Sequence, residues 1–354
     1  MLKILFAPLQ GYTTGIYRKA HAEIFGGVDA YYAPFLRIEN GKPREKDLRD
    51  LEIANADCAN VKCAGIAEGI ARDGNAREEN CAGYNVVPQI IANSVDEFKI
   101  LANALIAKGY TEIDFNMGCP FPMQVNRHRG AGLLSDALAV QEIMNEIKKI
   151  SCAANGTAPA MAKVTAPVKF SVKMRLGQDS PNEAFALLLI LNEAPLTQIT
   201  LHPRLGKQQY KGAIDFKSFE KFYEECRHPL VYNGDITSVS QICEMERRYP
   251  KLAGVMIGRG LLARPSLAAE YKSLCNTNCA ATAQNFLGKL FQMHQVFFDH
   301  ACKTYQGDSQ ILSHVQSFWE YLEPSIPKKI FKKIKKAGKL SEYQEAITAM
   351  RSLS

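Results

Sequence analysis

The sequence has no apolar run close to the ~18–20 residues that a membrane-spanning helix needs. Its first residues, MLKILFAPLQG, carry one lysine and a very short apolar stretch that ends at Pro8. This pattern predicts a first β-strand rather than a signal peptide. We therefore expect a cytoplasmic protein with no membrane segment, whose ten cysteines are thiols rather than disulfides.

Several common cofactor and catalytic signatures are also missing. No G-x-G-x-x-G follows the first predicted strand, and neither H-E-x-x-H nor G-x-S-x-G occurs. The cysteines most suggestive of a cluster lack the C-x₂-C pairs of ordinary zinc sites. We therefore expect no metal site at Cys58, Cys63, Cys81, Cys275 and Cys279.

Charge is unevenly distributed along the 354 residues, which carry a net charge of +7. From residue 281 to the end there are nine Lys and one Arg against two Asp and four Glu, a net +4. The preceding 280 residues hold the remaining +3. This asymmetry indicates a polyanionic partner for the C-terminal part.

Eight short β-rich runs alternate with helix-length stretches such as Ser94–Lys108 and Asp136–Ile150. Most are continuous apolar runs, which is typical of parallel strands covered on both faces. Eight strand–helix units in roughly 260 residues predict an α/β protein with a (β/α)₈ TIM barrel. A doubly wound sheet is the alternative, disfavoured by the missing glycine fingerprint. The runs are Lys3–Pro8, Ala30–Arg37, Val86–Ala92, Glu112–Gly118, Phe170–Leu176, Gln198–Pro203, Leu230–Gly234 and Gly254–Gly258.

Residues 52–83 and 151–167 interrupt this alternation of strands and helices, and we expect both to be loop insertions on the barrel. After about residue 281 only helical periodicity remains. We therefore expect two domains, a barrel over residues 1–280 and a helical domain over residues 281–354. The helices predicted in the second are Phe286–Tyr305, Ile311–Leu322, Lys328–Lys336 and Ser341–Leu353.

Polar residues and glycines follow most of the predicted strands. In a TIM barrel these strand ends converge at one mouth and build the active site. The glycines after the last two strands could expose backbone N–H groups to a phosphate, and Lys173 could place a cation beside a cofactor. The residues at these ends include Ala7, Pro8, Leu9, Gln89, Asn116, Cys119, Lys173, Arg175, His202, Asn233, Gly234, Asp235, Gly258 and Arg259.

The segments APLQG, PQIIAN, DFNMGCP, VKMRLG, LHPR, YNGDI and GVMIGRG resemble, in order and spacing, those of the tRNA-dihydrouridine synthase family. The N-x-G-C-P motif is the most specific of them. Two positions differ from the usual pattern: Leu9 stands where Met is common, and Pro203 stands where Gly follows the histidine.

The resemblance implies an FMN-containing barrel that reduces the C5–C6 double bond of a uridine in tRNA, with NADPH as a transient reductant and Cys119 as the proton donor. Asn116 and Arg175 would face the uracil. The residues implied to hold FMN are Ala7, Pro8 and Leu9 against the ring, Gln89 at its edge, Lys173 and His202 beside it, and Asn233, Gly234, Asp235, Gly258 and Arg259 at the phosphate.

A cysteine suits the expected chemistry. Saturating the double bond needs a hydride at C6, which reduced flavin supplies, and a proton at C5. A thiol with a pKa near ~8.5 is mostly protonated at neutral pH and can donate. Cys119 could instead be a buried core cysteine, but its place at a strand end between Gly118 and Pro120 favours the catalytic role.

A lysine-rich run, PKKIFKKIKKAGK, covers residues 327–339. On a helix, its apolar residues Ile330, Phe331 and Ile334 would share one stripe and its lysines the rest. We expect contacts with the tRNA backbone from Lys328, Lys329, Lys332 and Lys333. We also expect Arg127 and Arg129, just after the cysteine motif, to lie in a basic loop that closes on RNA.

Two other functions stay open. An FMN-barrel oxidoreductase could act on a small molecule such as a free pyrimidine or an enone, although the basic tail argues against it. A catalytically inactive RNA-binding barrel is the second, and the intact set of Asn116, Cys119, Lys173 and His202 argues against that. Nothing in the sequence calls for an obligate protein partner.

Overall fold

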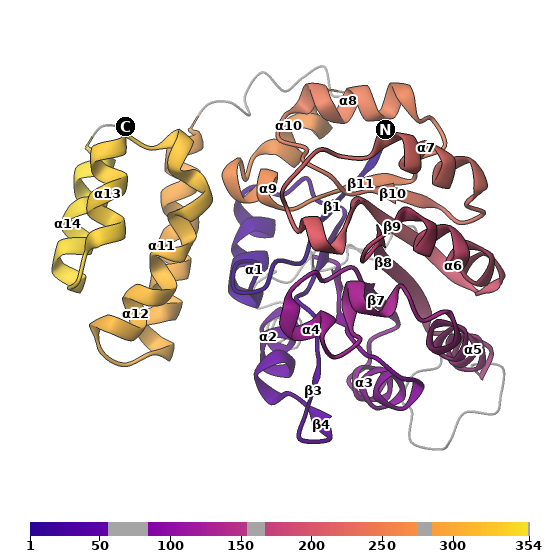
Figure 1. Ribbon diagram of the computed structural model, residues 1–354. Coiled ribbons are helices and arrows are strands. Elements are labelled where there is room, and N and C mark those ends of the chain that lie inside the picture. Colours follow the sequence, from indigo (N-terminus) through magenta and orange to yellow (C-terminus); the bar gives the residue numbers. More distant parts are fainter. Residues whose placement is uncertain (56–83, 154–166, 275–284, 353–354) are drawn as a thin grey trace, which may run out of the picture.

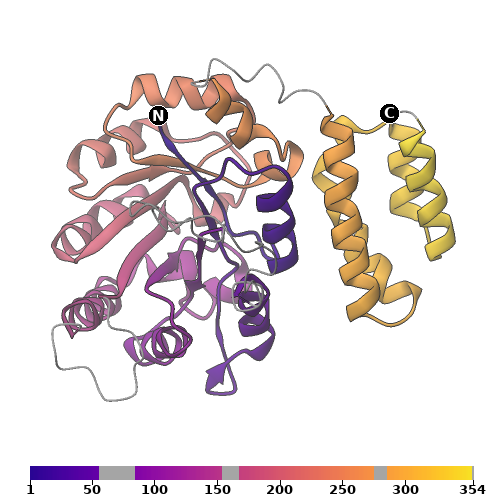
Figure 2. The ribbon, with the colours of Figure 1, turned by 180° about the vertical axis from the view of Figure 1, so that it is seen from behind.

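The computed structural model of the protein describes residues 1–55, 84–153, 167–274 and 285–352. A barrel of strands surrounded by helices forms the larger part, and the C-terminal helices pack beside it (Figures 1 and 2). No helix in the described part of the chain is long and apolar enough to cross a bilayer.

Nine strands form one parallel sheet in the order β5-β2-β1-β11-β10-β9-β8-β7-β6. The two outermost strands, β5 (Val86–Val87) and β6 (Gln89–Ile90), are successive pieces of one run. They are separated by Pro88, which has no N–H for the strand ladder. Since β5 pairs with β2 and β6 with β7, this run joins the two ends of the sheet into a barrel.

All eight predicted strands are confirmed, and with them the TIM barrel. Two differ clearly from the prediction: the second ends at Tyr32 rather than Arg37, and the third is split into two. The remaining barrel strands are β1 (Lys3–Phe6), β2 (Ala30–Tyr32), β7 (Glu112–Met117), β8 (Lys169–Gly177), β9 (Leu196–Leu205), β10 (Leu230–Tyr232) and β11 (Gly254–Ile257).

The barrel helices begin at capping residues visible in the sequence. Ser94 accepts a hydrogen bond from the N–H of Glu97 at the start of α3, and Ser180 and Ser238 form capping boxes at α6 and α8. The helices around the barrel are α1 (Gly15–Ile24), α2 (Glu45–Asn55), α3 (Val95–Ala107), α5 (Ala137–Ala153), α6 (Pro181–Glu193), α7 (Phe216–Glu225), α8 (Val239–Arg248) and α10 (Leu267–Ser273).

Short elements occupy the loops between these helices and strands. They are α4 (Pro122–Val125), the 3₁₀ turns η1 (Gly130–Leu133) and η2 (Gly206–Gln208), α9 (Arg259–Ala263), and a hairpin of β3 (Ile38–Glu39) and β4 (Lys42–Pro43). The predicted insertions begin later than expected, because residues 52–55 continue α2 and residues 151–153 continue α5. Most of both insertions lies outside the described residues, as do Cys58, Cys63, Cys81, Cys275 and Cys279.

The C-terminal part is helical, with α11 (Phe286–Thr304), α12 (Asp308–Val315), η3 (Ser317–Ser325), α13 (Lys328–Lys336) and α14 (Leu340–Arg351). The predicted helix Ile311–Leu322 is wrong as a single element, because it divides near Gln316 into α12 and the tighter η3. Within η3 the fully buried Trp319 donates a hydrogen bond from Nε1 to the hydroxyl of Tyr343 (2.7 Å).

Aromatic side chains join these helices to the barrel. Tyr17 of α1 contacts the rings of Phe297 and Phe318, with centroids 6.4 and 6.1 Å away. The hydroxyl of Tyr12 donates to Glu320 (2.8 Å). The expected domain boundary near residue 280 lies outside the described residues.

Candidate active site

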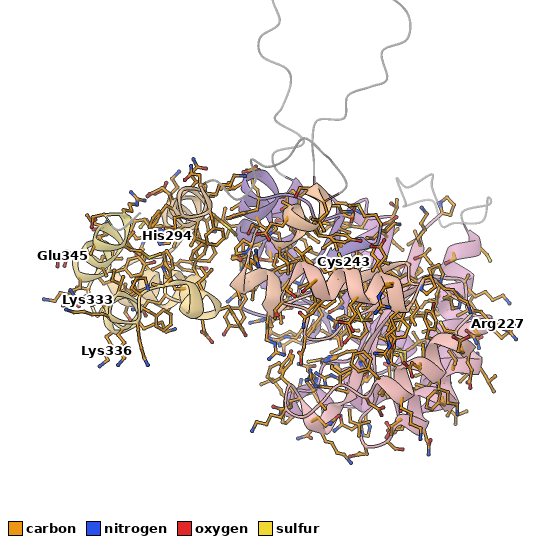
Figure 3. All side chains as sticks on the ribbon, turned by 90° about the horizontal axis from the view of Figure 1, so that it is seen from above. Arg227, Cys243, His294, Lys333, Lys336 and Glu345 are labelled. Carbon is orange, nitrogen blue, oxygen red and sulfur yellow. The ribbon has the colours of Figure 1, made fainter. Side chains whose placement is uncertain are left out.

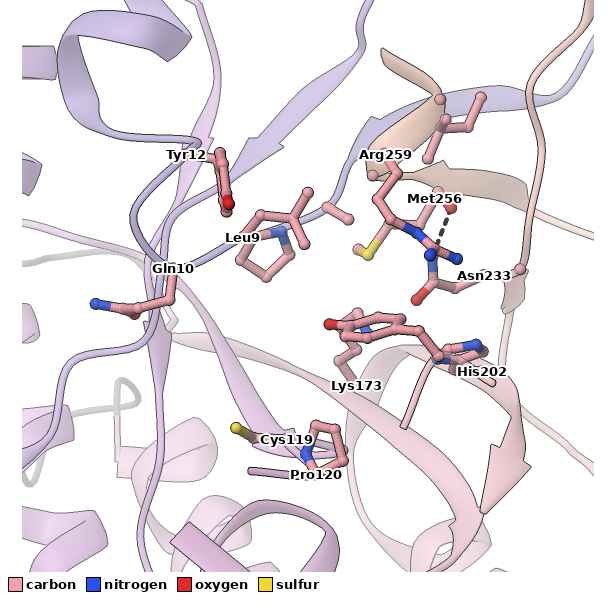
Figure 4. Close-up of a pocket in the computed structure, with 18 of the residues that line it drawn as sticks. Leu9, Gln10, Tyr12, Cys119, Pro120, Lys173, His202, Asn233, Met256 and Arg259 are labelled. Carbon is pink, nitrogen blue, oxygen red and sulfur yellow. Dashed lines mark hydrogen bonds between the residues drawn. The ribbon is translucent and has the colours of Figure 1, made fainter. Parts of the chain in front are cut away.

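A cavity of about 530 Å³ opens at the carboxyl ends of the barrel strands, where TIM barrels build their active sites. Figure 4 shows Cys119 on one side of it, Asn233 and Arg259 on another, and Lys173 between them. Every predicted strand-end residue lines it: Ala7, Pro8, Leu9, Gln89, Asn116, Cys119, Lys173, Arg175, His202, Asn233, Gly234, Asp235, Gly258 and Arg259.

Cys119 lies in a tight loop directly after β7 and is 7% exposed. Asn116 Oδ1 accepts hydrogen bonds from the N–H groups of Gly118 (3.0 Å) and Cys119 (2.9 Å). Arg175 Nε donates to the carbonyl of Gly118 (3.0 Å), and the N–H of Ala131 donates to the carbonyl of Cys119 (3.0 Å). These four hydrogen bonds fix the backbone on both sides of the thiol.

The Cys119 thiol is held in its protonated form. Burial raises its pKa above the ordinary value, and this effect outweighs the opposing effects of a hydrogen bond from the backbone of Phe121 and of the cations Arg175 and Lys173. The thiol is therefore the dominant form at neutral pH, as a proton donor requires.

Gly130 lets the following loop fold back onto Cys119. Its φ is +60°, and an added Cβ would lie 2.7 Å from the carbonyl oxygen of Cys119 and 2.8 Å from its Cβ. We predict that Gly130→Ala lowers the free energy of unfolding by about 2–4 kcal/mol, because strain and a clash add. Gly109→Ala is the control, since its φ is +90° with nothing within 4 Å, and it should cost about 1 kcal/mol. Equal losses in urea unfolding would contradict the close approach.

Asp114, which the sequence analysis missed, anchors a hydrogen-bond chain below the cysteine loop. It is fully buried and accepts from Ser171 Oγ (2.5 Å) and Gln89 Nε2 (2.7 Å). Gln89 Oε1 in turn accepts from Asn116 Nδ2 (2.7 Å). Burial raises the pKa of Asp114 to about 6, so the carboxylate is mainly ionised at neutral pH. An ionised carboxylate only accepts hydrogen bonds, and the N–H groups of the cysteine loop only donate them. The side-chain amides of Gln89 and Asn116 can therefore each satisfy their partners in only one orientation.

Two cations and a neutral imidazole come from β8 and β9. Burial and the neighbouring Arg175 lower the pKa of Lys173 to about 8, which leaves it mostly charged at pH 7. Burial and the same cations lower the pKa of His202 well below its ordinary value. Nη1 of Arg175 donates to the carbonyls of Leu205 (2.9 Å) and Gln209 (2.7 Å), whereas Nη2 has no hydrogen-bond partner among the described residues.

The loop after β10 carries a charge cluster. Asp235 accepts hydrogen bonds from Arg204 (Nη1 3.0 Å, Nη2 2.5 Å) and from Arg259 Nη2 (2.8 Å). Side-chain hydrogen bonding from Arg204 lowers the pKa of Asp235 despite partial burial. Arg204, next to the unusual Pro203, therefore pairs with Asp235. The excess charge at this end of the cavity is positive.

Three further features of these loops bear on the binding of an anion. Asn233 is held by a hydrogen bond from its Nδ2 to the carbonyl of Met256 (2.7 Å, Figure 4). Helix α9 begins at Arg259, and the first N–H groups of a helix have no partner within it. At Gly258 an added Cβ would lie 3.3 Å from both Ala7 Cβ and Leu9 Cδ1, so glycine keeps this wall open.

The predicted RNA contacts are not gathered at the cavity. Arg129 is 5% exposed, and its guanidinium is paired with Glu97 through Nε (2.9 Å) and Nη2. This buried pair removes the reason to expect RNA contact from Arg129, whereas Arg127 is exposed. The lysines of α13 are exposed but do not line the cavity, and Figure 3 shows Lys333 projecting on the side away from the barrel.

Aromatic residues from loops and from η3 complete the cavity wall, and none of them was predicted from the sequence. Those in loops show no periodic pattern, and the one in η3 reaches the cavity only through tertiary packing. The ring of Tyr210 lies 5.6 Å from the guanidinium carbon of Arg175 and 4.8 Å from that of Arg259. Tyr321 comes from η3 and contacts Tyr12 at a centroid distance of 5.0 Å. These wall residues are Tyr12, Phe35, Phe121, Tyr210 and Tyr321.

A buried thiol, several cations and a neutral histidine at the carboxyl end of a parallel (β/α)₈ barrel define a TIM-barrel enzyme. The dihydrouridine synthase (Dus) family matches residues 70–351. The chain belongs to this family, whose members are flavin-dependent enzymes.

Named relatives agree with this assignment. The chain is 27% identical over 276 residues to a tRNA-dihydrouridine(16) synthase of Neisseria meningitidis serogroup B, covering 77% of this chain and 72% of that protein. It is 29% identical over 194 residues to tRNA-dihydrouridine synthase B of Pasteurella multocida, covering 54% of this chain and about half (53%) of that protein. Among solved structures, histamine dehydrogenase from Rhizobium sp. 4-9 superposes with a TM-score of 0.49 at 11% identity, covering 77% of this chain and 45% of that one.

Proposed function

We propose that this protein is a tRNA-dihydrouridine synthase that uses FMN and NADPH to reduce the C5–C6 double bond of a uridine in tRNA. The observation that carries this proposal is Cys119, a protonated thiol fixed at the mouth of a cationic cavity in a chain of the dihydrouridine synthase family. Such an enzyme would work in the cytoplasm, where tRNA is processed.

The cavity residues fit FMN. Ala7, Pro8 and Leu9 offer an apolar wall for the ring, while Lys173 and the Gln89 amide offer donors for its polar edge. The phosphate needs positive charge and N–H donors, which Arg259 and the start of α9 supply. Asp235 would contribute backbone only, because its carboxylate is already paired with Arg204 and Arg259.

The side chains around Cys119 divide the chemistry between them. Reduced flavin bound here would supply the hydride for C6 of the uracil. Cys119 would donate the proton to C5 as a general acid. Asn116 Nδ2 and Arg175 Nη2 would donate hydrogen bonds to the uracil carbonyls, orienting the base and stabilising the negative charge that develops on O4 before C5 is protonated.

NADPH would bind at the same mouth, reduce the cofactor and leave before tRNA enters. We propose transient binding because the parallel strands of the described chain close into a barrel and do not form a separate dinucleotide-binding sheet. We further propose that residues 281–354 form a helical RNA-binding domain beside a catalytic barrel of residues 1–280. The exposed lysines of α13 support that division.

The direct test is dihydrouridine formation. Flavin-loaded protein with NADPH and tRNA from cells lacking the enzyme should produce dihydrouridine at a defined position. Absence of product on tRNA, combined with reduction of a free pyrimidine or an enone, would instead identify a small-molecule reductase.

Lys173→Ala should weaken FMN binding by about 10- to 100-fold, the scale of one lost hydrogen bond to a charged group. Fluorescence titration of the flavin-free protein measures this affinity. Lys169→Ala is the matched control, because Lys169 begins the same strand but is 59% exposed and does not line the cavity. Equal affinity of the Lys173→Ala variant and its parent would count against flavin contact at this position.

A further inference from the structure

One large apolar side chain stands exposed at the rim of the cavity. Phe121 lines the cavity and is 52% exposed. Scattered exposed apolar residues are normal on protein surfaces. Phe121 differs because it lies at an active-site mouth, two residues after the cysteine, where an exposed aromatic ring can serve as a binding surface.

The backbone that carries Phe121 is held in place beside the cysteine loop. Pro120 and Pro122 restrict the backbone on either side of it. Its carbonyl accepts hydrogen bonds from the N–H groups of Gln124 (2.8 Å) and Val125 (3.0 Å). A backbone that is ordered in advance loses little conformational entropy when a partner covers the ring.

The surrounding charge indicates which partner covers the ring. Arg127 and His128 are exposed in the loop that follows Phe121, whereas Arg129 is buried in its ion pair with Glu97. A flat aromatic face within a positively charged surface is the combination that binds the bases of single-stranded nucleic acid. An apolar small molecule would need no such charge.

The contents of the cavity place this contact outside it. The cavity of about 530 Å³ lies in the size range of cofactor and small-molecule sites, and in the proposed function FMN and the uracil already share it. A uridine that enters it leaves the stack of its RNA, at a cost of a few kcal/mol. The bases on either side stay outside, at the rim, and lose a stacking partner.

We propose that Phe121 forms a stacking surface for a base adjacent to the reduced uridine, taking the place that the uridine vacates. This inference rests on the proposed function and adds a second nucleotide contact, distinct from the uracil site. Phe121 supplies the flat aromatic face on which the base stacks.

The test measures tRNA affinity across salt concentrations. Phe121→Ala should weaken binding by about 5- to 100-fold. The slope against salt should stay unchanged, because stacking releases no counterions. Phe121→Trp should remain within about threefold of the parent, since it keeps an aromatic face.

Leu189→Ala is the matched control, because Leu189 is 75% exposed on α6 and does not line the cavity. It should bind tRNA like the parent. Parent-like affinity of Phe121→Ala, or a tryptophan variant as weak as the alanine one, would overturn the stacking surface. Failure of the parent enzyme to form any dihydrouridine would instead overturn the proposed function, and the inference with it.

Discussion

Cys119→Ala should reduce tRNA at least ~100-fold more slowly than the parent, the usual scale for losing a general acid, while its FMN is still reduced by NADPH. The thiol carries a transferable proton at this side of the cavity, and burial raises its pKa above the ordinary value. Because the protonated form donates, the proton-transfer step should stay constant through neutral pH and decline only as pH rises through the raised pKa. Stopped-flow measurement of the two half-reactions separates the effects.

The two half-reactions make this prediction specific. Flavin reduction needs no proton from position 119, so a variant that fails equally in both would show that the cysteine is structural. Cys243→Ala provides a control, because Cys243 is a half-buried free cysteine that lies on α8 and does not line the cavity. It should leave both rates unchanged.

The barrel could be predicted because its strands are apolar runs followed by polar ends. In β7, Ile113 and Phe115 are fully buried, and the motif that ends the strand delivers Cys119 to the mouth. The split of the third strand was harder to predict, since Pro88 interrupts a run that still reads as apolar. The break between α12 and η3 near Gln316 was not predicted for a related reason. The residues of η3 keep the apolar spacing of an α-helix, although the backbone winds more tightly.

The site was predictable only where it follows strand ends. Asp114 could have been recognised as a carboxylate inside an apolar strand, but its link through Gln89 to Asn116 depends on strand neighbours that the sequence does not reveal. Arg129 looked like a basic loop residue because its partner Glu97 lies 32 positions away. Tyr321 reaches the cavity from the helices after residue 285, so only tertiary packing places it there.

Replacing Lys328, Lys329, Lys332 and Lys333 with Gln should weaken tRNA binding and flatten its salt dependence. Each lysine that neutralises a phosphate releases condensed counterions, so the slope of log affinity against log salt should fall in magnitude by up to about 3. All four side chains are exposed on α13. Among the described residues, the ion pair recorded on this helix is that of Lys335 with Glu320 (3.7 Å), which the variant leaves intact.

Helix α13 should still dock in this variant, because its buried residues Ile330, Phe331 and Ile334 are unchanged. A charge-matched control replaces four exposed lysines elsewhere on the barrel, Lys3, Lys148, Lys149 and Lys169. If net charge alone attracted tRNA, both variants would lose the same affinity, whereas a specific contact at α13 predicts a loss confined to the first. Reduction of FMN by NADPH should be normal in both, because that half-reaction needs no RNA. Unchanged affinity and slope in the α13 variant would show that these lysines only face solvent, and RNA contact would then be sought at Arg127. The same result would restore a small-molecule reductase as a serious alternative.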